Sequence, residues 1–176
     1  MRGRNGEVLG THLQKVIQAM PASEVALENY SALADDLDPN GWYDWNLFVT
    51  STHAIAARLP SDTLIEIGKR LVYTAEELLV QQGFDSLDKV MSDWSAVFRA
   101  NTRGVPDIDW IQTAAFERGH VVIEFSDAHV PEMVEGYMRG FVELFDHTVT
   151  AFQASLRSKS PRIYCYDMRY LAITRP

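Results

Sequence analysis

One stretch, Gly119–Phe145, constrains the fold of this chain more than any other part of the sequence. It begins with an apolar run, His120–Phe125, of the kind that forms a buried strand. The run breaks at the polar corner Ser126–His129, and helical spacing follows, with Gly136 and Gly140 one turn apart. A strand, a polar corner and a helix with small residues on one face, in succession, predict the wall of a pocket. Tight packing of the helix on a sheet is the alternative explanation for the glycines.

Before this stretch the apolar residues recur with the spacing of helices. The spacing predicts helices over residues 8–20, 45–58, 61–82 and 86–98, with a further short helix after Ser23. Pro21, Pro60 and Gly83 end three of them, because proline cannot continue a helix and glycine accepts the left-handed conformation that closes one. Asp44 is the predicted N-cap of the helix over 45–58.

From residue 106 onward, alternating apolar residues predict strands on both sides of the last helix. Trp110–Phe116 and His120–Phe125 form one predicted hairpin, and Thr148–Leu156 and Ile163–Ile173 form another. The fold class is therefore α+β: an N-terminal helical part, about residues 1–105, followed by a four-stranded antiparallel sheet with one crossing helix, about 106–176. The 176 residues are expected to form a single domain.

Composition excludes several classes of protein. The net charge is -8 and the pI is about 5.0, whereas a nucleic-acid surface needs clustered Lys and Arg. Cys165 is the single cysteine, so no internal disulfide can form, which fits a reducing cytoplasm. No apolar run approaches the length of a membrane span. A cytoplasmic protein without a nucleic-acid partner is the expectation.

Four short segments carry a resemblance to a known superfamily. They are Val8-Leu9-Gly10, Gly41-Trp42-Tyr43, Ile67-Gly68-Lys69, and the strand-corner-helix stretch with Gly136 and Gly140. In these segments the chain resembles the superfamily of haem nitric-oxide/oxygen-binding (H-NOX) domains, 4-vinyl reductase (V4R) domains and TRAPP-type vesicle-tethering subunits. It is most similar to the bacterial H-NOX/V4R-like sensor branch. The resemblance covers nearly the whole chain and implies a hydrophobic pocket between the helical part and the sheet.

In H-NOX domains the resemblance implies haem in that pocket, with an axial histidine on a middle helix and a Tyr-x-Ser-x-Arg motif that grips the propionates. The predicted helix over 86–98 contains no histidine, and Trp94 lies where one would be sought. The counterpart of the motif reads Phe125, Asp127 and His129. Arginine binds a carboxylate twice, whereas Asp127 would repel it. The haem motif is therefore degenerate, and the cofactor is left unknown.

The candidate ligand-binding residues come from the segments that the resemblance places at the pocket. They are Trp94, Phe125, Asp127, His129, Gly136, Gly140 and Phe141. For Asp127 the structural alternative is a helix cap, with His129 solvated or hydrogen-bonded nearby. If haem binds, His53 is the candidate metal ligand because it lies within a predicted helix, and a polar helix edge is its structural alternative.

The sequence contains no Ser-His-Asp set, phosphate loop or H-E-x-x-H spacing, so no catalytic residue is predicted. The leading interpretation is a non-enzymatic ligand-binding or sensor domain that takes a small apolar or planar ligand and signals to a protein partner. A haem-dependent NO/O2 sensor is one alternative. A structural dimerisation or scaffold protein of the TRAPP-like type is another, and a homodimer is expected in either case.

Overall fold

The computed structural model describes residues 6–18 and 36–173. The helices are α1 (Gly10–Gln18), α3 (Trp45–Ala56), α4 (Ser61–Thr74), α5 (Glu76–Gln81), α6 (Leu87–Ser92), α7 (Trp94–Arg99) and α8 (Pro131–Leu144). The strands are β1 (Glu7–Leu9), β2 (Trp42–Asp44), β3 (Thr102–Arg103), β4 (Ile111–Glu117), β5 (His120–Ser126), β6 (His147–Lys159) and β7 (Arg162–Ala172). The predicted short helix after Ser23 lies outside the described residues, as does the predicted end of the first helix.

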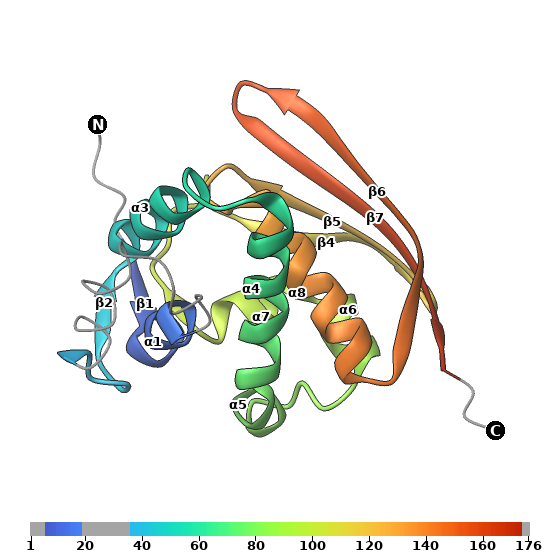
Figure 1. Cartoon of the computed structure of the whole chain (residues 1–176), viewed down its shortest axis with the longest axis horizontal. Helices are drawn as coiled ribbons and strands as arrows, with labels where there is room; N and C mark the ends of the chain where they lie inside the picture. Colours follow the sequence, from blue (N-terminus) through green and yellow to red (C-terminus); the bar gives the residue numbers. More distant parts are fainter. Residues whose placement is uncertain (1–5, 19–35, 174–176) are drawn as a thin grey trace.

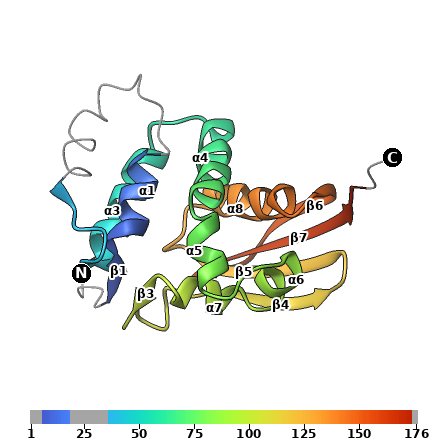
Figure 2. The ribbon, with the colours of Figure 1, turned by 90° about the horizontal axis from the view of Figure 1, so that it is seen from below.

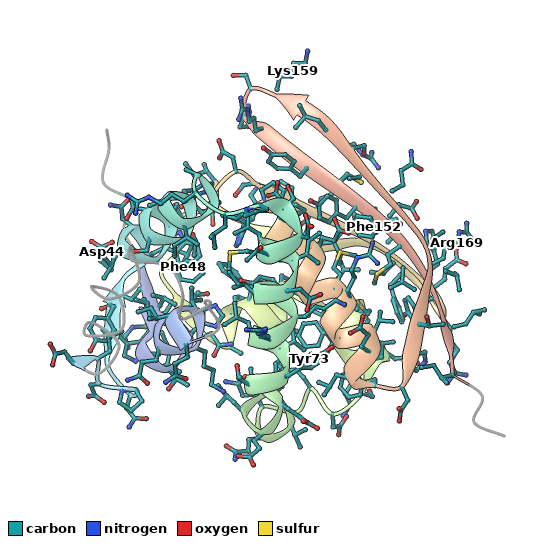
Figure 3. The ribbon with its side chains drawn as sticks, viewed as in Figure 1. Asp44, Phe48, Tyr73, Phe152, Lys159 and Arg169 are labelled. Atoms are coloured by element: carbon teal, nitrogen blue, oxygen red, sulfur yellow. The ribbon has the colours of Figure 1, made fainter. Side chains whose placement is uncertain are left out.

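The predicted α+β fold class is confirmed, and the larger sheet has the predicted four strands. Its order is β4-β5-β7-β6, with every neighbouring pair antiparallel. The alternation of β5 places Val121, Ile123 and Phe125 on the inner face, where each is fully buried. Helix α8 crosses this face, and β6 and β7 form a long hairpin at one side (Figure 1). Lys159 lies at the tip of that hairpin, away from the helices (Figure 3).

A second, smaller sheet was missed in the sequence. Within the described residues its order is β2-β1-β3, and Val8 pairs with Tyr43 on one side and with Thr102 on the other. The prediction that Val8 and Leu9 begin a helix is therefore wrong, since the helix begins at Gly10. Val8 is fully buried between two strands from distant parts of the chain, and such pairing overrides the local helical spacing.

Two of the predicted helices are each broken in two. The predicted helix over 61–82 divides at Ala75 into α4 and α5. The predicted helix over 86–98 divides at Asp93, whose backbone angles are not helical and whose carboxylate accepts a hydrogen bond from the Ala96 N–H at 2.9 Å. This side chain caps a new helix, α7, which begins at Trp94.

The core consists of two clusters of buried residues. One lies among β1, α1, α3 and the first half of α4, and the other lies between α4–α7, α8 and the large sheet. Phe98 and Tyr137 pack against both clusters, so they mark the junction. Seen from below, α4 crosses α8 at a steep angle near this junction (Figure 2). Within the described residues, none of the helices is both long and apolar enough to cross a membrane.

Candidate functional site

A cavity of about 100 Å³ lies between the two core clusters. Residues of α1, α3, α4, α7 and α8 contribute to its wall, together with Asn101 and Thr102 and the start of β4. Most of the lining is aromatic or aliphatic. The residues of this kind are Trp45, Phe48, Leu71, Val72, Ala75, Leu79, Trp94, Val97, Phe98, Ile111, Val130, Met133, Val134, Tyr137 and Phe141.

Aromatic rings from three helices, α3, α7 and α8, meet around the cavity. The rings of Trp45 and Phe48 stack with centroids 4.9 Å apart, and Phe98 lies edge-on to Trp45 at 5.4 Å. On another side, Trp94 of α7 and Phe141 of α8 meet at 89° with centroids 5.5 Å apart. Trp94 and Phe141 were both candidate ligand-binding residues, and the structure brings them together at the cavity. A wall of this kind suits a flat apolar molecule.

His129 reaches the cavity from the corner that follows β5. The corner is held by the Ser126 N–H, which donates to the Trp110 carbonyl at 3.0 Å, and by the His129 N–H, which donates to the Ser126 carbonyl at 3.3 Å. The His129 side chain is buried, and its ring lies 5.2 Å from Phe98 and 5.9 Å from Trp45. Of the two structural alternatives for His129, solvated or hydrogen-bonded, its burial excludes the solvated one.

The other two positions of the degenerate motif, Phe125 and Asp127, lie outside the cavity. Phe125 is fully buried, with its ring stacked on Tyr164 at 5.3 Å and edge-on to His129 at 6.4 Å, so it supports His129 from behind. Asp127 is exposed. It does not cap the helix either, because α8 begins at Pro131 with Val130 as the N-cap residue. Proline at the first helical position has the backbone angle that a helix start requires.

Gly136 and Gly140 face α4 rather than the cavity, and they are not among the residues that line it. A Cβ added at Gly136 would lie 2.8 Å from the Gly68 Cα, and one at Gly140 would lie 3.0 Å from the Lys69 Cα. The close approach that these glycines predicted is thus to another helix backbone, not to a ligand or to the sheet. His53 is exposed on α3 and does not reach the cavity.

His12 and Lys15 of α1 line the cavity and were not predicted. The signal was weak: His12 shares a helix face with the buried Val16. Burial, and secondarily the charge of Lys15, lower the pKa of His12 from 6.5 to about 4, so the ring is neutral at pH 7. The Lys15 ammonium donates to the Thr74 carbonyl, and burial lowers its pKa as well.

A buried hydrogen bond fixes the aromatic wall to the segment before β4. The Trp45 indole N–H donates to a carboxylate oxygen of Asp109 at 2.9 Å, and both side chains are almost fully buried. Trp45 is therefore held in one orientation between Phe48, Phe98 and the His129 ring.

No protein-family model matches the sequence, and no curated protein matches it either. Solved structures do match, and the following three are all H-NOX proteins. An H-NOX protein from Shewanella oneidensis in the Fe(II)NO state is 12% identical, with 92% of this chain and 98% of that chain covered and a TM-score of 0.58. A variant of Tt H-NOX is 10% identical, with 96% and 98% covered and a TM-score of 0.61. An unliganded Fe(II) H-NOX protein from K. algicida is 9% identical, with 94% and 89% covered and a TM-score of 0.54.

These matches show that the chain has an H-NOX-like fold, as the resemblance in the sequence predicted. At such low sequence identity, the matches show the fold alone. The N-terminal helices followed by a four-stranded antiparallel sheet match that fold.

The residues of the cavity do not fit a haem bound as the resemblance implies. Helix α7 offers Trp94 where an axial histidine would be sought, and the corner after β5 offers Phe125, Asp127 and His129 in place of the propionate motif. The cavity volume of about 100 Å³ is also well below the roughly 300–1,000 Å³ of typical cofactor and drug sites. Among the described residues, no group of three or more His, Cys, Asp or Glu could hold a metal ion.

Proposed function

We propose that this chain is a non-enzymatic ligand-binding sensor domain whose interior cavity takes a small apolar or planar molecule. The observation that supports this best is the position of the cavity between the two core clusters, with an aromatic lining from both. A molecule bound there would contact apolar side chains of both core clusters at once. Ligand-sized apolar voids inside close-packed proteins are few, which makes this one the natural binding site.

Binding at this place would couple the two parts of the fold. Trp45 and Phe48 of α3 belong to one core cluster, and Trp94 and Phe141 belong to the other. Helices α4 and α8 are held together by close backbone contact, so an occupant changes how α3 and α7 pack around this fixed pair. A ligand that favours one packing shifts the population toward it, and a protein partner can read that shift.

Filling the cavity from inside tests the proposal. Ala75 lies in the wall of the cavity, so Ala75→Leu is expected to occupy part of the space without a ligand. The melting temperature of the native protein is expected to rise in the presence of benzene, because a ligand that binds only the folded state stabilises it. The Ala75→Leu variant is expected to lose most of this rise.

Ala154→Leu is the matched control, since the same change is made on the exposed strand β6 far from the lining residues. It should keep the full response to benzene. No rise in the native protein, or an equal rise in the native protein and in Ala75→Leu, would refute binding in the cavity.

Haem is the alternative ligand, and His129 and His12 are the histidines that line the cavity. Because the surrounding residues do not fit haem, adding it to the purified protein is expected to give no Soret band. A Soret band that disappears in the His129→Ala variant would favour a haem-dependent gas sensor instead.

A scaffold function is favoured by one further observation. Leu156 of β6 and Leu171 of β7 are large apolar side chains that are 45% and 63% exposed on the long hairpin. A homodimer that covers such residues is part of the proposal. Light scattering at high protein concentration tests it, and a strict monomer would remove both the dimer and the TRAPP-like alternative.

A further inference from the structure

Asn101 lines the cavity, and its side chain carries a buried polar atom. Its backbone is fixed, because its N–H donates to the Phe98 carbonyl at 3.2 Å and its carbonyl accepts from the Leu9 N–H at 3.0 Å. Its side-chain oxygen Oδ1 is buried, and it has no hydrogen-bond partner among the described residues. A buried acceptor without a hydrogen bond costs free energy. A ligand group that donates to this oxygen therefore gains more binding free energy than the same hydrogen bond would give in water.

The two threonine hydroxyl groups of the cavity are already used as donors. Thr52 donates to the Phe48 and Val49 carbonyls of its own helix at 3.0 Å. Thr102 donates to the Phe98 carbonyl at 2.9 Å. Neither threonine therefore offers a free proton to a ligand, and each can only accept.

Charge in the cavity is also low. The His12 ring is neutral at pH 7 because its pKa lies near 4. The Lys15 side chain lines the cavity, but its ammonium donates to the Thr74 carbonyl, and Thr74 is exposed and not part of the lining. Long basic side chains commonly bury their stems while the charged end stays near water. The interior of the cavity thus suits an uncharged molecule.

Size and shape restrict the ligand further. The volume of about 100 Å³ is of the same order as the roughly 150 Å³ of an engineered apolar cavity that binds benzene. The aromatic rings of Trp94, Phe141 and Phe98 form flat surfaces around this volume. One ring, or an aliphatic molecule of similar size, fills it.

We propose that the ligand is an uncharged molecule of about one ring that carries a single O–H or N–H donor, and that this donor binds Asn101 Oδ1. The inference rests on the proposed function and names the chemical class of its ligand. Asn101 is then the residue that determines specificity, since it distinguishes a donor-bearing ring from a plain hydrocarbon of the same shape.

Phenol and benzene are the matched probes, because they differ by one hydroxyl group. Their affinities are measured by titration, followed by tryptophan fluorescence and by the melting temperature. The native protein is expected to bind phenol at least as tightly as benzene. In Asn101→Leu, phenol affinity is expected to fall about tenfold, the scale of one lost hydrogen bond, while benzene affinity stays within about threefold.

Thr52→Val tests the rival acceptor in the cavity wall, and the inference predicts that it leaves the ratio of the two affinities unchanged. Binding of benzene but not phenol by the native protein would overturn the inference and leave the proposed function standing. Loss of phenol binding in Thr52→Val but not in Asn101→Leu would also overturn it. If neither probe binds, the proposed function itself fails. Should Asn101→Leu not fold, the ratio in the native protein decides alone.

Discussion

Gly68 of α4 and Gly136 of α8 lie against each other, backbone to backbone. A Cβ added at either one would come within 2.8 Å of the Cα of the other, a distance that real Cβ atoms essentially never show. The two helices therefore cross at a point where no side chain separates them. This contact sets the distance between α4 and α8 and so fixes one side of the cavity, whose lining includes Leu71 and Met133.

We expect Gly136→Ala to destabilise the protein by about 1–3 kcal/mol, the usual cost of overpacking. The sign of this change in stability is informative, because alanine in a helix interior is otherwise favoured over glycine by about 1 kcal/mol. Chemical denaturation measures the free energy of unfolding. Gly140→Ala is the graded control: its added Cβ would meet the Lys69 Cα at 3.0 Å and the Val72 Cβ at 3.2 Å, so its cost should be clearly smaller. Equal stability of native and Gly136→Ala proteins would contradict the contact.

Acidification should destabilise the protein through His12. Burial and the Lys15 charge lower the pKa of His12 from 6.5 to about 4, so the unfolded chain binds more protons than the folded chain between these values. The stability contributed by the neutral ring is full above pH 6.5 and is lost as the pH falls toward 4. The upper limit is about 3 kcal/mol, because one pKa unit corresponds to about 1.4 kcal/mol.

Urea denaturation at several pH values between 7 and 4.5 measures this contribution as the slope of the free energy of unfolding against pH. In His12→Asn the slope in this window should be shallower than in the native protein. His53→Asn, at an exposed position of α3, is the control and should keep the native slope. Parallel slopes for the native and His12→Asn proteins would show that His12 is not the titrating group.

Asp93 is expected to control the position of Trp94 in the cavity wall. Its carboxylate accepts from the Ser95 hydroxyl at 2.7 Å and from the Ala96 N–H at 2.9 Å, which caps α7. Asp93→Ala should cost about 1 kcal/mol, as the loss of an N-cap does, and should change the tryptophan fluorescence. Ser95→Ala removes only one of the two hydrogen bonds and should have a smaller effect. An unchanged spectrum in Asp93→Ala would mean that the cap does not position Trp94.

Glu143 joins α8 to α4 on the side away from the sheet. Its carboxylate accepts from Lys69 Nζ at 2.8 Å and from the Tyr73 hydroxyl at 2.5 Å, and Tyr73 is visible on α4 in Figure 3. Burial acts to raise the pKa of Glu143, but these hydrogen bonds and the nearby positive charges outweigh it and hold the pKa below its usual value. The stability from this ionised group is therefore present above the ordinary pKa of a glutamate and is lost as the pH falls below it.

A double-mutant cycle of Glu143→Gln and Tyr73→Phe measures the coupling between the two side chains. Because both are partly exposed, we expect a coupling free energy of only about 0.5–1 kcal/mol at pH 7. The coupling free energy should be smaller still at pH 3. Strictly additive single-mutant effects at pH 7 would contradict the interaction.

Much of the fold followed from local patterns in the sequence. The alternation in 110–125 and 148–173 predicted the two hairpins, because a strand with one buried face must alternate. Asp44 was correctly predicted to cap α3, and its carboxylate accepts from the Asn46 N–H at 2.7 Å. A capping side chain acts within a few residues, so its effect is visible in a short segment of sequence.

The small sheet and the breaks at Ala75 and Asp93 were missed for a common reason. Val8 forms a strand because Tyr43 and Thr102 pair with it, and neither pairing leaves a trace in residues 7–9. Tertiary contacts of this kind override weak local preferences. The same applies to the cavity: Trp94, His129 and Phe141 were predicted to bind a ligand, whereas the contributions of His12, Lys15 and Asn101 depend on where α1 and the end of α7 pack.

By itself the sequence determined the fold class, the order of elements and the importance of the stretch Gly119–Phe145, since these depend on hydrophobic period and local capping. Only the tertiary structure decided what each residue of that stretch does. His129 turns inward to the cavity, Asp127 turns outward, and Gly136 meets Gly68. Two glycines one turn apart indicate that another group approaches the helix closely. Which backbone approaches it depends on the packing of a helix more than sixty residues away in the sequence.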